Sequence, residues 1–218
     1  RQMCIRDSSW IGKGQIIVLV GQRRVGKSFV LKDFIERHKS ETDANIISID
    51  KEKKSFDAVK TYQDLNGFID QRFDSHKHNY ILIDEVQNIS EWERTVRSYR
   101  TEDNTDIIVT GSNSSMLSSD LGTIIGGRYE EIHIHSLNYK EFLLFHNLED
   151  SDSSLALFLN YGGLPGLSRV GIEDDEHCWE YISGVYNTVM LKDVIERHSI
   201  RNLSFMNNLV RFLADNVG

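Results

Sequence analysis

The sequence is poor in residues that cross-link a chain or break its regular structure. It has one proline, Pro165, and two cysteines, Cys4 and Cys178, among 218 residues. Two cysteines cannot form a disulfide framework and lack metal-site spacing, so we expect a reducing, cytoplasmic setting. No apolar run approaches the roughly 20 residues that span a bilayer, and the N-terminus lacks the apolar core of a secretory signal. These absences argue against a disulfide-stabilised secreted domain and against a membrane protein.

A basic surface is also missing. The formal net charge is −8, with 39% apolar and 27% charged residues, which is typical of a globular protein. Residues 147–181 contain eight acids against Arg169 alone, a net charge of −7, so the remainder is nearly neutral. We interpret this window as a solvated acidic surface. No basic stripe indicates direct binding of nucleic acid by this chain.

The chain ends raise a separate expectation. Residues 1–8, RQMCIRDS, have no place in a fold whose first strand begins near Gln15, and they resemble a translated sequencing adapter. We predict that they are a non-native leader. The last helical pattern runs to Gly218 with no following element, so we expect the chain to be an N-terminal fragment of a longer protein.

Apolar periodicity predicts strands alternating with helices. The strand-like runs are QIIVLV (15–20), NIISID (45–50), NYILID (79–84), DIIVTG (106–111) and YEEIHIH (129–135). The helical patterns between them are 27–38, 57–73 and 90–99. Such alternation is typical of a mostly parallel sheet covered on both faces, an α/β fold.

Two details of these helices are predicted as well. In the first helix, Phe29, Val30, Phe34 and Ile35 are expected to share the buried face. In the third, Ser90 is the expected N-cap, with Glu93 three residues later forming a capping box.

After His135 the pattern changes to helices only, interrupted at YGGLPG, a tight connection. We therefore predict an α/β core over 9–136, a helical subdomain over 137–200 and the beginning of another domain over 201–218.

The stretch GQRRVGKS follows the first strand and opens the first helix. Gly21, Gly26, Lys27 and Ser28 fit the pattern G-x-x-x-x-G-K-[ST]. Glycines let the backbone curl so that its amides point at phosphate, the lysine reaches the β- and γ-phosphates, and the hydroxyl ligates magnesium. The helix N-terminus favours the same negative charge. The predicted ATP-binding residues are Gly21, Gln22, Arg23, Arg24, Val25, Gly26, Lys27, Ser28 and Phe29.

The segment YILIDEVQ places Asp84 and Glu85 at the end of the third strand. This pair fits an aspartate in the magnesium shell and a glutamate that orients and deprotonates the attacking water. The predicted metal ligands are therefore Ser28 and Asp84, and the predicted catalytic residues include Lys27 and Glu85.

Two further catalytic candidates follow. In DIIVTGSNSS, Thr110, Ser112 or Asn113 is a candidate sensor of the γ-phosphate; Ser112 is preferred, although it also suits a helix cap. In GGRYEE, Arg128 stands at a loop edge, where its guanidinium suits a phosphate or a neighbouring subunit's nucleotide, although such arginines are commonly solvated.

The motifs GQRRVGKS, LIDEVQ, VTGSNSSML, GGRYEEIHIHSLNYKEF, YGGLPG and LKDVIERHSIRN occur in an order that resembles one family. This family is the bacterial and archaeal AAA-type ATP-binding proteins with a C-terminal domain of unknown function. The resemblance runs from about Gly14 to Gly218. His135 and Asn138 depart from it, because family members commonly have Pro and Phe there.

The resemblance implies a five-stranded P-loop core with the strand order 5-1-4-3-2, a helical lid, a winged helix that FMNNLVRFLADNVG would begin, and a nuclease-like domain absent from this chain. It implies ATP at Gly21 to Ser28, Mg²⁺ at Ser28 and Asp84, water activation by Glu85, and a catalytic role for Arg128.

Three functions are compatible with these residues. The first is a Mg²⁺-dependent ATPase that acts as a nucleotide-driven switch. The second is a nucleotide-binding docking module with little turnover, in which the acidic window contacts a protein partner. The third is a small-molecule P-loop kinase, which the Asp84–Glu85 pair disfavours, because such kinases place the general base elsewhere. Self-association is compatible with each function, and nucleic-acid binding is expected only through the missing C-terminal part.

Overall fold

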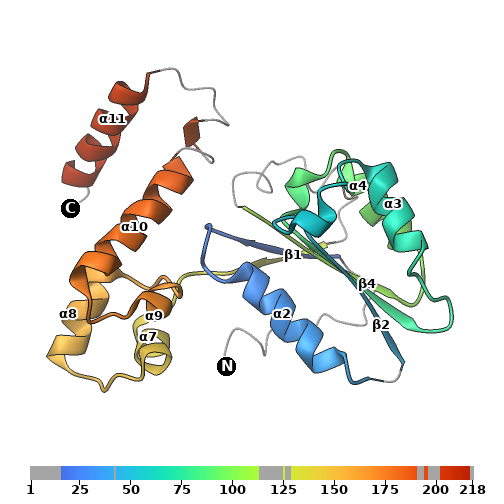
Figure 1. Cartoon of the computed structure of the whole chain (residues 1–218), viewed down its shortest axis with the longest axis horizontal. Helices are drawn as coiled ribbons and strands as arrows, with labels where there is room; N and C mark the ends of the chain where they lie inside the picture. The colour runs from blue at the N-terminus through green and yellow to red at the C-terminus, as the bar shows by residue number, and fades with distance from the viewer. Residues whose placement is uncertain are drawn as a thin grey trace.

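The computed structural model of this chain describes residues 16–41, 43–112, 125, 129–190, 194–195 and 202–216. The predicted leader, 1–8, lies outside these residues. An α/β core and a group of C-terminal helices stand side by side (Figure 1). No described helix combines the length and the apolar character that a bilayer crossing requires.

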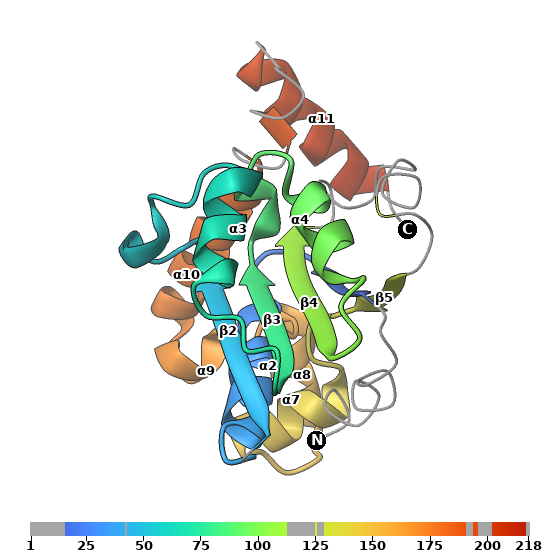
Figure 2. The same ribbon diagram turned by 90° about the vertical axis from the view of Figure 1, so that its right-hand side faces the viewer.

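The core is built on a five-stranded sheet in the order β2-β3-β4-β1-β5. All four strand pairs are parallel. The strands are β1 (Ile16–Gly21), β2 (Ala44–Asp50), β3 (His78–Asp84), β4 (Thr105–Ser112) and β5 (Tyr129–His133). This is the predicted order read from the opposite edge, and the predicted α/β P-loop fold is confirmed. Figure 2 shows β2, β3 and β4 next to one another.

Helices cover both faces of the sheet, which explains why β1 is apolar and buried along its whole length. α2 (Lys27–His38) lies on one face, and α3 (Tyr62–Asp70) and α4 (Trp92–Tyr99) lie on the other (Figure 1). Alternate residues of β1 point to opposite faces. Ile17 packs in the cluster that contains Phe34 of α2, whereas Val18 packs in the cluster that contains Leu65 of α3.

The predicted buried face of α2 was partly wrong. Leu31 and Phe34 are its buried apolar residues, whereas the Phe29 side chain is 61% exposed. Val30 and Ile35 pack at the margin of the cluster. Phe29 lies in the first turn of α2, where its ring lies beside the Lys32 and Arg169 side chains instead of in the sheet cluster.

The predicted start of α3 and the predicted cap of α4 were also wrong. α3 begins at Tyr62, where Thr61 and Asp64 form a capping box. Ser90 does not cap α4, because its backbone pairs with the chain before α3: its N–H donates to the Lys60 carbonyl at 2.8 Å. Glu91 is the N-cap instead, with φ of 56° and no capping hydrogen bond from its side chain.

Two short 3-10 turns connect these elements: η1 (Lys54–Phe56) precedes α3, and η2 (Val86–Asn88) follows β3. After β5 the described residues are helical, as predicted. The helices are α7 (Tyr139–His146), α8 (Asp152–Tyr161), α9 (Leu167–Val170), α10 (Asp175–Val189) and α11 (Leu203–Asn216). We call α7 to α10 the helical part. It has its own apolar cluster, centred on Phe142, Leu167 and Cys178. The proposed domain limits and the winged-helix assignment stay predictions.

Candidate nucleotide-binding site

The segment Gly21 to Ser28, here called the phosphate loop, curls between the end of β1 and the start of α2. Two residues in it have left-handed backbone: Gly26, with φ of 110°, and Arg24, with φ of 66°. At Gly21, a Cβ atom would lie 2.3 Å from the Ile134 carbonyl oxygen, so only glycine fits there. The sequence thus supplies glycine at one close approach and at one of the two left-handed positions.

Lys27 lies inside the curl of the loop. Its side chain is buried, and its Nζ donates to the Gly21 carbonyl at 2.8 Å and to the Gln22 carbonyl at 3.1 Å. An ammonium group enclosed by a backbone loop provides positive charge at the place where the loop amides converge. Ser28 follows in the first turn of α2, which contains no acidic residue. This helix end favours an anion through its partial positive charge.

The acid pair, Asp84 and Glu85, lies at the same edge of the sheet. β4 separates β3 from β1, and all three run parallel, so the carboxyl ends of β1 and β3 flank Thr110 and its neighbours. Both carboxylates are largely buried, with relative exposures of 4% and 7%. In open parallel sheets, ligands bind at this edge, where the strand order reverses.

Thr110 connects the two acids. Its Oγ1 donates to Asp84 Oδ1 and accepts the Glu85 backbone N–H at 3.0 Å. Glu85 has left-handed backbone, with φ of 54°, which turns its side chain away from the line of β3. One buried hydroxyl therefore holds the Asp84 carboxylate and fixes the turn that presents Glu85.

Two side chains approach the Glu85 carboxylate. Gln87 Nε2 donates to its Oε2, and Arg23 Nη1 lies 4.0 Å from the same oxygen. Because Arg23 belongs to the phosphate loop, this ion pair joins the loop directly to the acid pair. Neither residue was predicted to be catalytic from the sequence. The only signal was their position inside the two motifs, since spacing does not reveal which way a side chain points.

The structure brings together the phosphate loop and the acid pair, but it does not place every predicted site residue. Ser112 ends β4, and its side chain is not among those described. Arg128 and Asn113 lie outside the described residues. Thr110, the third sensor candidate, is the one that the structure places against the acids. The catalytic roles predicted for Ser112 and Arg128 stay predictions.

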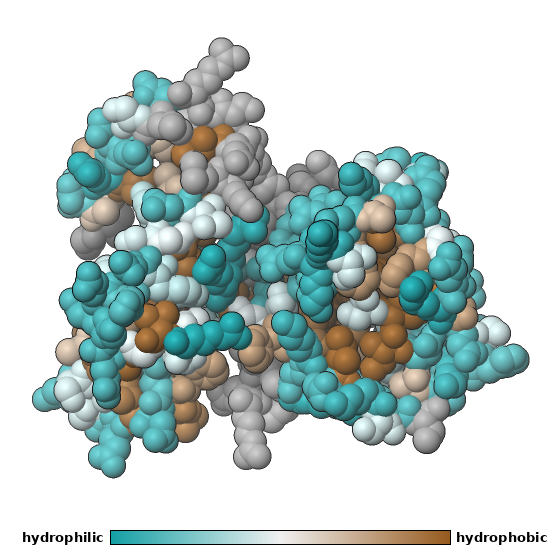
Figure 3. All heavy atoms as spheres, viewed as in Figure 1, coloured by the Kyte–Doolittle hydropathy of each residue, from teal (hydrophilic) through white to brown (hydrophobic). Residues whose placement is uncertain are grey.

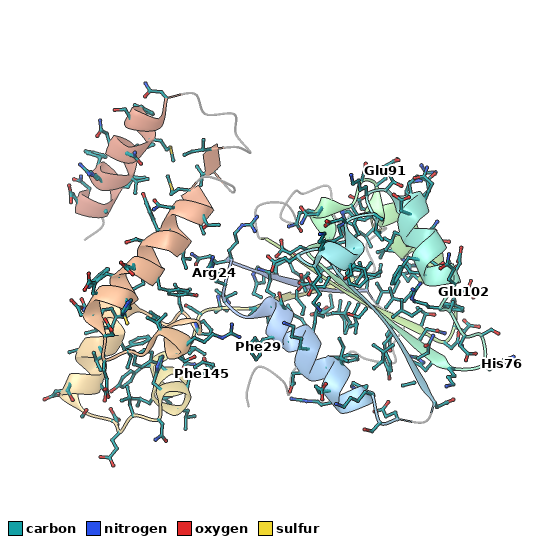
Figure 4. The ribbon with its side chains drawn as sticks, viewed as in Figure 1. Arg24, Phe29, His76, Glu91, Glu102 and Phe145 are labelled. Atoms are coloured by element: carbon teal, nitrogen blue, oxygen red, sulfur yellow. The ribbon has the colours of Figure 1, made fainter. Side chains whose placement is uncertain are left out.

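The phosphate loop also contacts the helical part. Arg24 Cζ lies 5.6 Å from the centroid of the Tyr181 ring in α10. Phe29 lies next to two cations, with Arg169 Cζ of α9 at 5.8 Å and Lys32 Nζ at 6.0 Å from its ring centroid. Figure 4 shows Arg24 and Phe29 on the side of the core that faces the helical part. All three contacts fall within the range of cation–π attraction.

Comparison with known proteins agrees with this geometry. A family described as an AAA domain matches residues 13–143, more than half of the 218 residues. The chain belongs to this family of AAA domains, which supports nucleotide binding. An uncharacterized protein of Haemophilus influenzae is 35% identical over 209 residues, covering 93% of this chain and 52% of that protein. The uncharacterized protein MJ1544 of Methanocaldococcus jannaschii is 30% identical over 202 residues, which cover 87% of this chain and 44% of that protein. The chain thus spans about half the length of these relatives.

Solved structures share the fold at low sequence identity. The Cdc6p structure from Pyrobaculum aerophilum has a TM-score of 0.51 and 14% identity, and the alignment covers 78% of this chain and 57% of that one. The ORC2 protein of Aeropyrum pernix, in its ADPNP-ADP complexes, has a TM-score of 0.53 and 10% identity. The alignment covers 84% of this chain and 66% of that one. At these identities the likeness concerns the fold alone.

Proposed function

We propose that this chain binds and hydrolyses ATP with Mg²⁺ and that its helical part responds to the nucleotide as a switch. The observation that carries the proposal is the direct connection between the two halves of the site. Arg23 of the phosphate loop approaches Glu85, and Thr110 holds Asp84 and the Glu85 turn at the same sheet edge.

The phosphate loop would bind the triphosphate. The backbone amides from Gly21 to Ser28 and the N-terminus of α2 donate to phosphate oxygens. Lys27 exchanges its two carbonyl acceptors, those of Gly21 and Gln22, for β- and γ-phosphate oxygens. Its enclosed position favours this exchange, because the short movement of one ammonium group replaces neutral partners with charged ones.

The Ser28 hydroxyl and the Asp84 carboxylate would hold Mg²⁺. Both are hard oxygen donors, which magnesium prefers, and Asp84 Oδ1 is already oriented by Thr110. When bound, the ion supplies charge neutralisation at the β- and γ-phosphates.

Glu85 would act on the attacking water. The water oxygen forms a bond to the γ-phosphorus, and the bond from that phosphorus to the β,γ-bridging oxygen breaks. The electron pair leaves with ADP, and the proton of the water passes to Glu85 before it returns to solvent. The Thr110 hydroxyl, by accepting the Glu85 N–H, holds the turn from which this carboxylate extends.

The switch proposal rests on the two contacts between the core and the helical part. Arg24 belongs to the loop that would enclose the phosphates, and Phe29 follows the residue that would bind Mg²⁺. A change of loop geometry on nucleotide binding therefore acts directly on Tyr181 and Arg169. A ligand shifts a conformational equilibrium only through such differential contacts.

Phosphate release by the chain, with and without EDTA, tests the ATPase proposal. We expect Mg²⁺-dependent release that falls by a factor of 100 or more in Lys27→Ala, on the order of effects seen when charge stabilisation of the transition state is lost. Lys39→Ala, at an exposed lysine that follows α2, is the matched control and should keep most of the activity. Release that survives Lys27→Ala would contradict the proposal.

A second candidate function, docking of a protein partner, has its own support. Nine of the ten large apolar side chains exposed in the described residues lie after residue 137. In α8, Leu155 and Leu159 are 40% and 75% exposed and share a face with Asp152. Figure 3 shows apolar and hydrophilic residues intermixed on the helical part. The eight acids of residues 147–181 are all exposed; they are Glu149, Asp150, Asp152, Glu173, Asp174, Asp175, Glu176 and Glu180.

Apolar side chains among acids fit a basic amphipathic helix. The probe is a fluorescein-labelled synthetic helix with leucines on one face and lysines on the other. We expect binding that weakens with salt and about tenfold in Leu155→Ser/Leu159→Ser, since each exposed leucine loses its apolar contact. The same helix with glutamates in place of lysines is the control; equal binding of both peptides, or no binding, would contradict the docking function.

A further inference from the structure

We propose that Gln87 is a positioning residue for Glu85 in the hydrolysis of ATP, a role that rests on the proposed ATPase function. Gln87 lies in η2, immediately after the acid pair, and its side chain is partly buried. In the sequence, Gln87 is the last residue of the motif LIDEVQ. The contacts of its amide group indicate that it orients the Glu85 carboxylate.

The amide orientation is fixed by chemistry. The Gln87 side chain meets Glu85 Oε2, and an ionised carboxylate is an acceptor without a donor of its own. The amide nitrogen, Nε2, must therefore face Glu85. The carbonyl oxygen, Oε1, then points to the other side of the amide group.

Gln87 Oε1 is buried and has no hydrogen-bond partner among the described residues. A buried acceptor without a hydrogen-bond donor lowers the stability of the fold, and such atoms in native proteins commonly bind a water or a ligand. The nitrogen and oxygen of one amide group are about 2.3 Å apart. Because Gln87 Nε2 is hydrogen-bonded to Glu85 Oε2, Gln87 Oε1 lies within about 5 Å of the same carboxylate oxygen. One water molecule bridges two acceptors at such a separation, with one hydrogen directed to each. The arrangement suits the water that Glu85 would deprotonate.

The backbone around Gln87 is held firmly enough to support this role. Val86 and Ile89, on either side of it, are 0% and 1% exposed. The Asn88 N–H donates to the Glu85 carbonyl at 3.1 Å, and the Ile89 N–H donates to the Val86 carbonyl at 3.0 Å. Glu85 and Gln87 therefore belong to one tight turn, and the hydrogen bond between them leaves the carboxylate few alternative rotamers.

Arg23 approaches the same oxygen of Glu85 from the phosphate loop, at 4.0 Å. The carboxylate is thus bordered by a residue of its own turn and by a residue of the loop that would hold the phosphates. Gln87 fixes the carboxylate relative to β3, while Arg23 relates it to the phosphate loop. Loss of Gln87 should therefore affect the chemical step and leave nucleotide binding intact.

The test compares Gln87→Met, which removes the amide, and Gln87→Glu, which keeps the shape but replaces the donor with an acceptor. The matched control is Gln63→Met, the same change at an exposed glutamine of α3. We measure kcat and KM for Mg-ATP, the Kd for a fluorescent ATP analogue, and Tm. We expect kcat to fall on the order of 10- to 100-fold in Gln87→Met and at least as far in Gln87→Glu, as for other supporting residues of a site. KM, Kd and Tm should stay near wild-type values, and Gln63→Met should match wild type throughout.

A double-mutant cycle separates positioning from packing. In a Glu85→Gln background, measured by single-turnover hydrolysis, Gln87→Met should cost less than threefold, because it acts through Glu85. An equal loss in both backgrounds, an unchanged kcat in Gln87→Met, or near-wild-type kcat in the isosteric Gln87→Glu would overturn the positioning role while leaving the ATPase standing. Absence of hydrolysis in the wild-type chain would overturn both.

Discussion

Arg24 of the phosphate loop lies over the ring of Tyr181 in α10, with its Cζ atom 5.6 Å from the ring centroid. The Tyr181 hydroxyl in turn packs against Gly166, where an added Cβ would lie 1.9 Å from the hydroxyl oxygen. Gly163, earlier in the same connection, accepts the Leu137 N–H at 2.7 Å. Tyr181 is therefore held between the phosphate loop and the YGGLPG turn, so a displacement of either acts on α10.

This contact predicts that α10 senses the nucleotide. In wild type, we expect the non-hydrolysable analogue ADPNP to slow amide hydrogen exchange in residues 175–189. Tyr181→Leu should reduce that protection, because it removes a cation–π contact of about 0.5–1 kcal/mol. Tyr181→Phe keeps the ring and should behave like wild type. If ADPNP protected residues 175–189 equally in wild type and in Tyr181→Leu, the contact between Arg24 and Tyr181 would not couple nucleotide binding to α10.

Glycines in the helical part should differ sharply in their response to alanine. At Gly163 a Cβ would lie 2.0 Å from the Leu137 carbonyl oxygen, a backbone atom that cannot turn aside. At Gly184 in α10, no described residue outside the adjoining turns of the helix comes within 4 Å of an added Cβ. We expect Gly163→Ala to lower the free energy of unfolding by roughly 1–3 kcal/mol or more. Gly184→Ala should raise it by up to about 1 kcal/mol. Urea denaturation measures both; a loss at Gly184 equal to that at Gly163 would contradict the packing described.

Thr110 should stabilise the site as well as the fold. Thr110→Val keeps the shape but removes the hydroxyl that bonds to Asp84 and receives the Glu85 N–H. The buried N–H then lacks a partner, which costs about 1–3 kcal/mol. Thr110→Ser keeps the hydroxyl and should lose less than half as much. Urea denaturation of the two variants decides, and an equally stable Thr110→Val would show that water replaces the hydroxyl.

The N-terminus of α10 should give a local pH dependence. Asp174 caps this helix by accepting the His177 N–H at 3.1 Å, and its carboxylate also bonds to the His177 ring. The bond to Asp174 raises the pKa of His177, and the bond to His177 lowers the pKa of Asp174. The pKa of His177 is higher in the folded protein than its value of about 6.5 in the unfolded chain. The stability that this histidine contributes is therefore fully present below about pH 6.5 and is lost as the pH rises through the folded-state pKa. Stability from the lowered carboxyl pKa is lost as pH falls below about 4.

Thermal unfolding between pH 5 and pH 9 tests the direction in which the stability contributed by His177 changes with pH. The Tm of His177→Ala should lie furthest below wild type near pH 5–6 and should approach it at pH 9. The control, His76→Ala, changes an exposed histidine in a turn of the core. A difference between wild type and His177→Ala that grows with pH would contradict the assignment.

The sequence was informative where a pattern depends on covalent geometry or on burial. Continuous apolar runs predicted the strands, and glycine spacing predicted the phosphate loop. Contacts between distant segments were not predictable. Ser90 has the sequence signature of a cap, but its backbone pairs with the chain at Lys60, so Glu91 takes the cap position. Arg23 and Thr110 meet at Glu85 only because β3, β4 and the phosphate loop end at one edge of the sheet.

The most direct test of the ATPase proposal separates binding from hydrolysis at Glu85. Glu85→Gln is incubated with Mg²⁺ and radiolabelled ATP, the bound nucleotide is recovered by rapid filtration, and its identity is determined by thin-layer chromatography. The account predicts that Glu85→Gln retains intact ATP, whereas wild type retains ADP and Lys27→Ala retains little nucleotide. Bound ADP in Glu85→Gln at the wild-type rate would contradict the role of Glu85, and with it the proposed chemistry of the site.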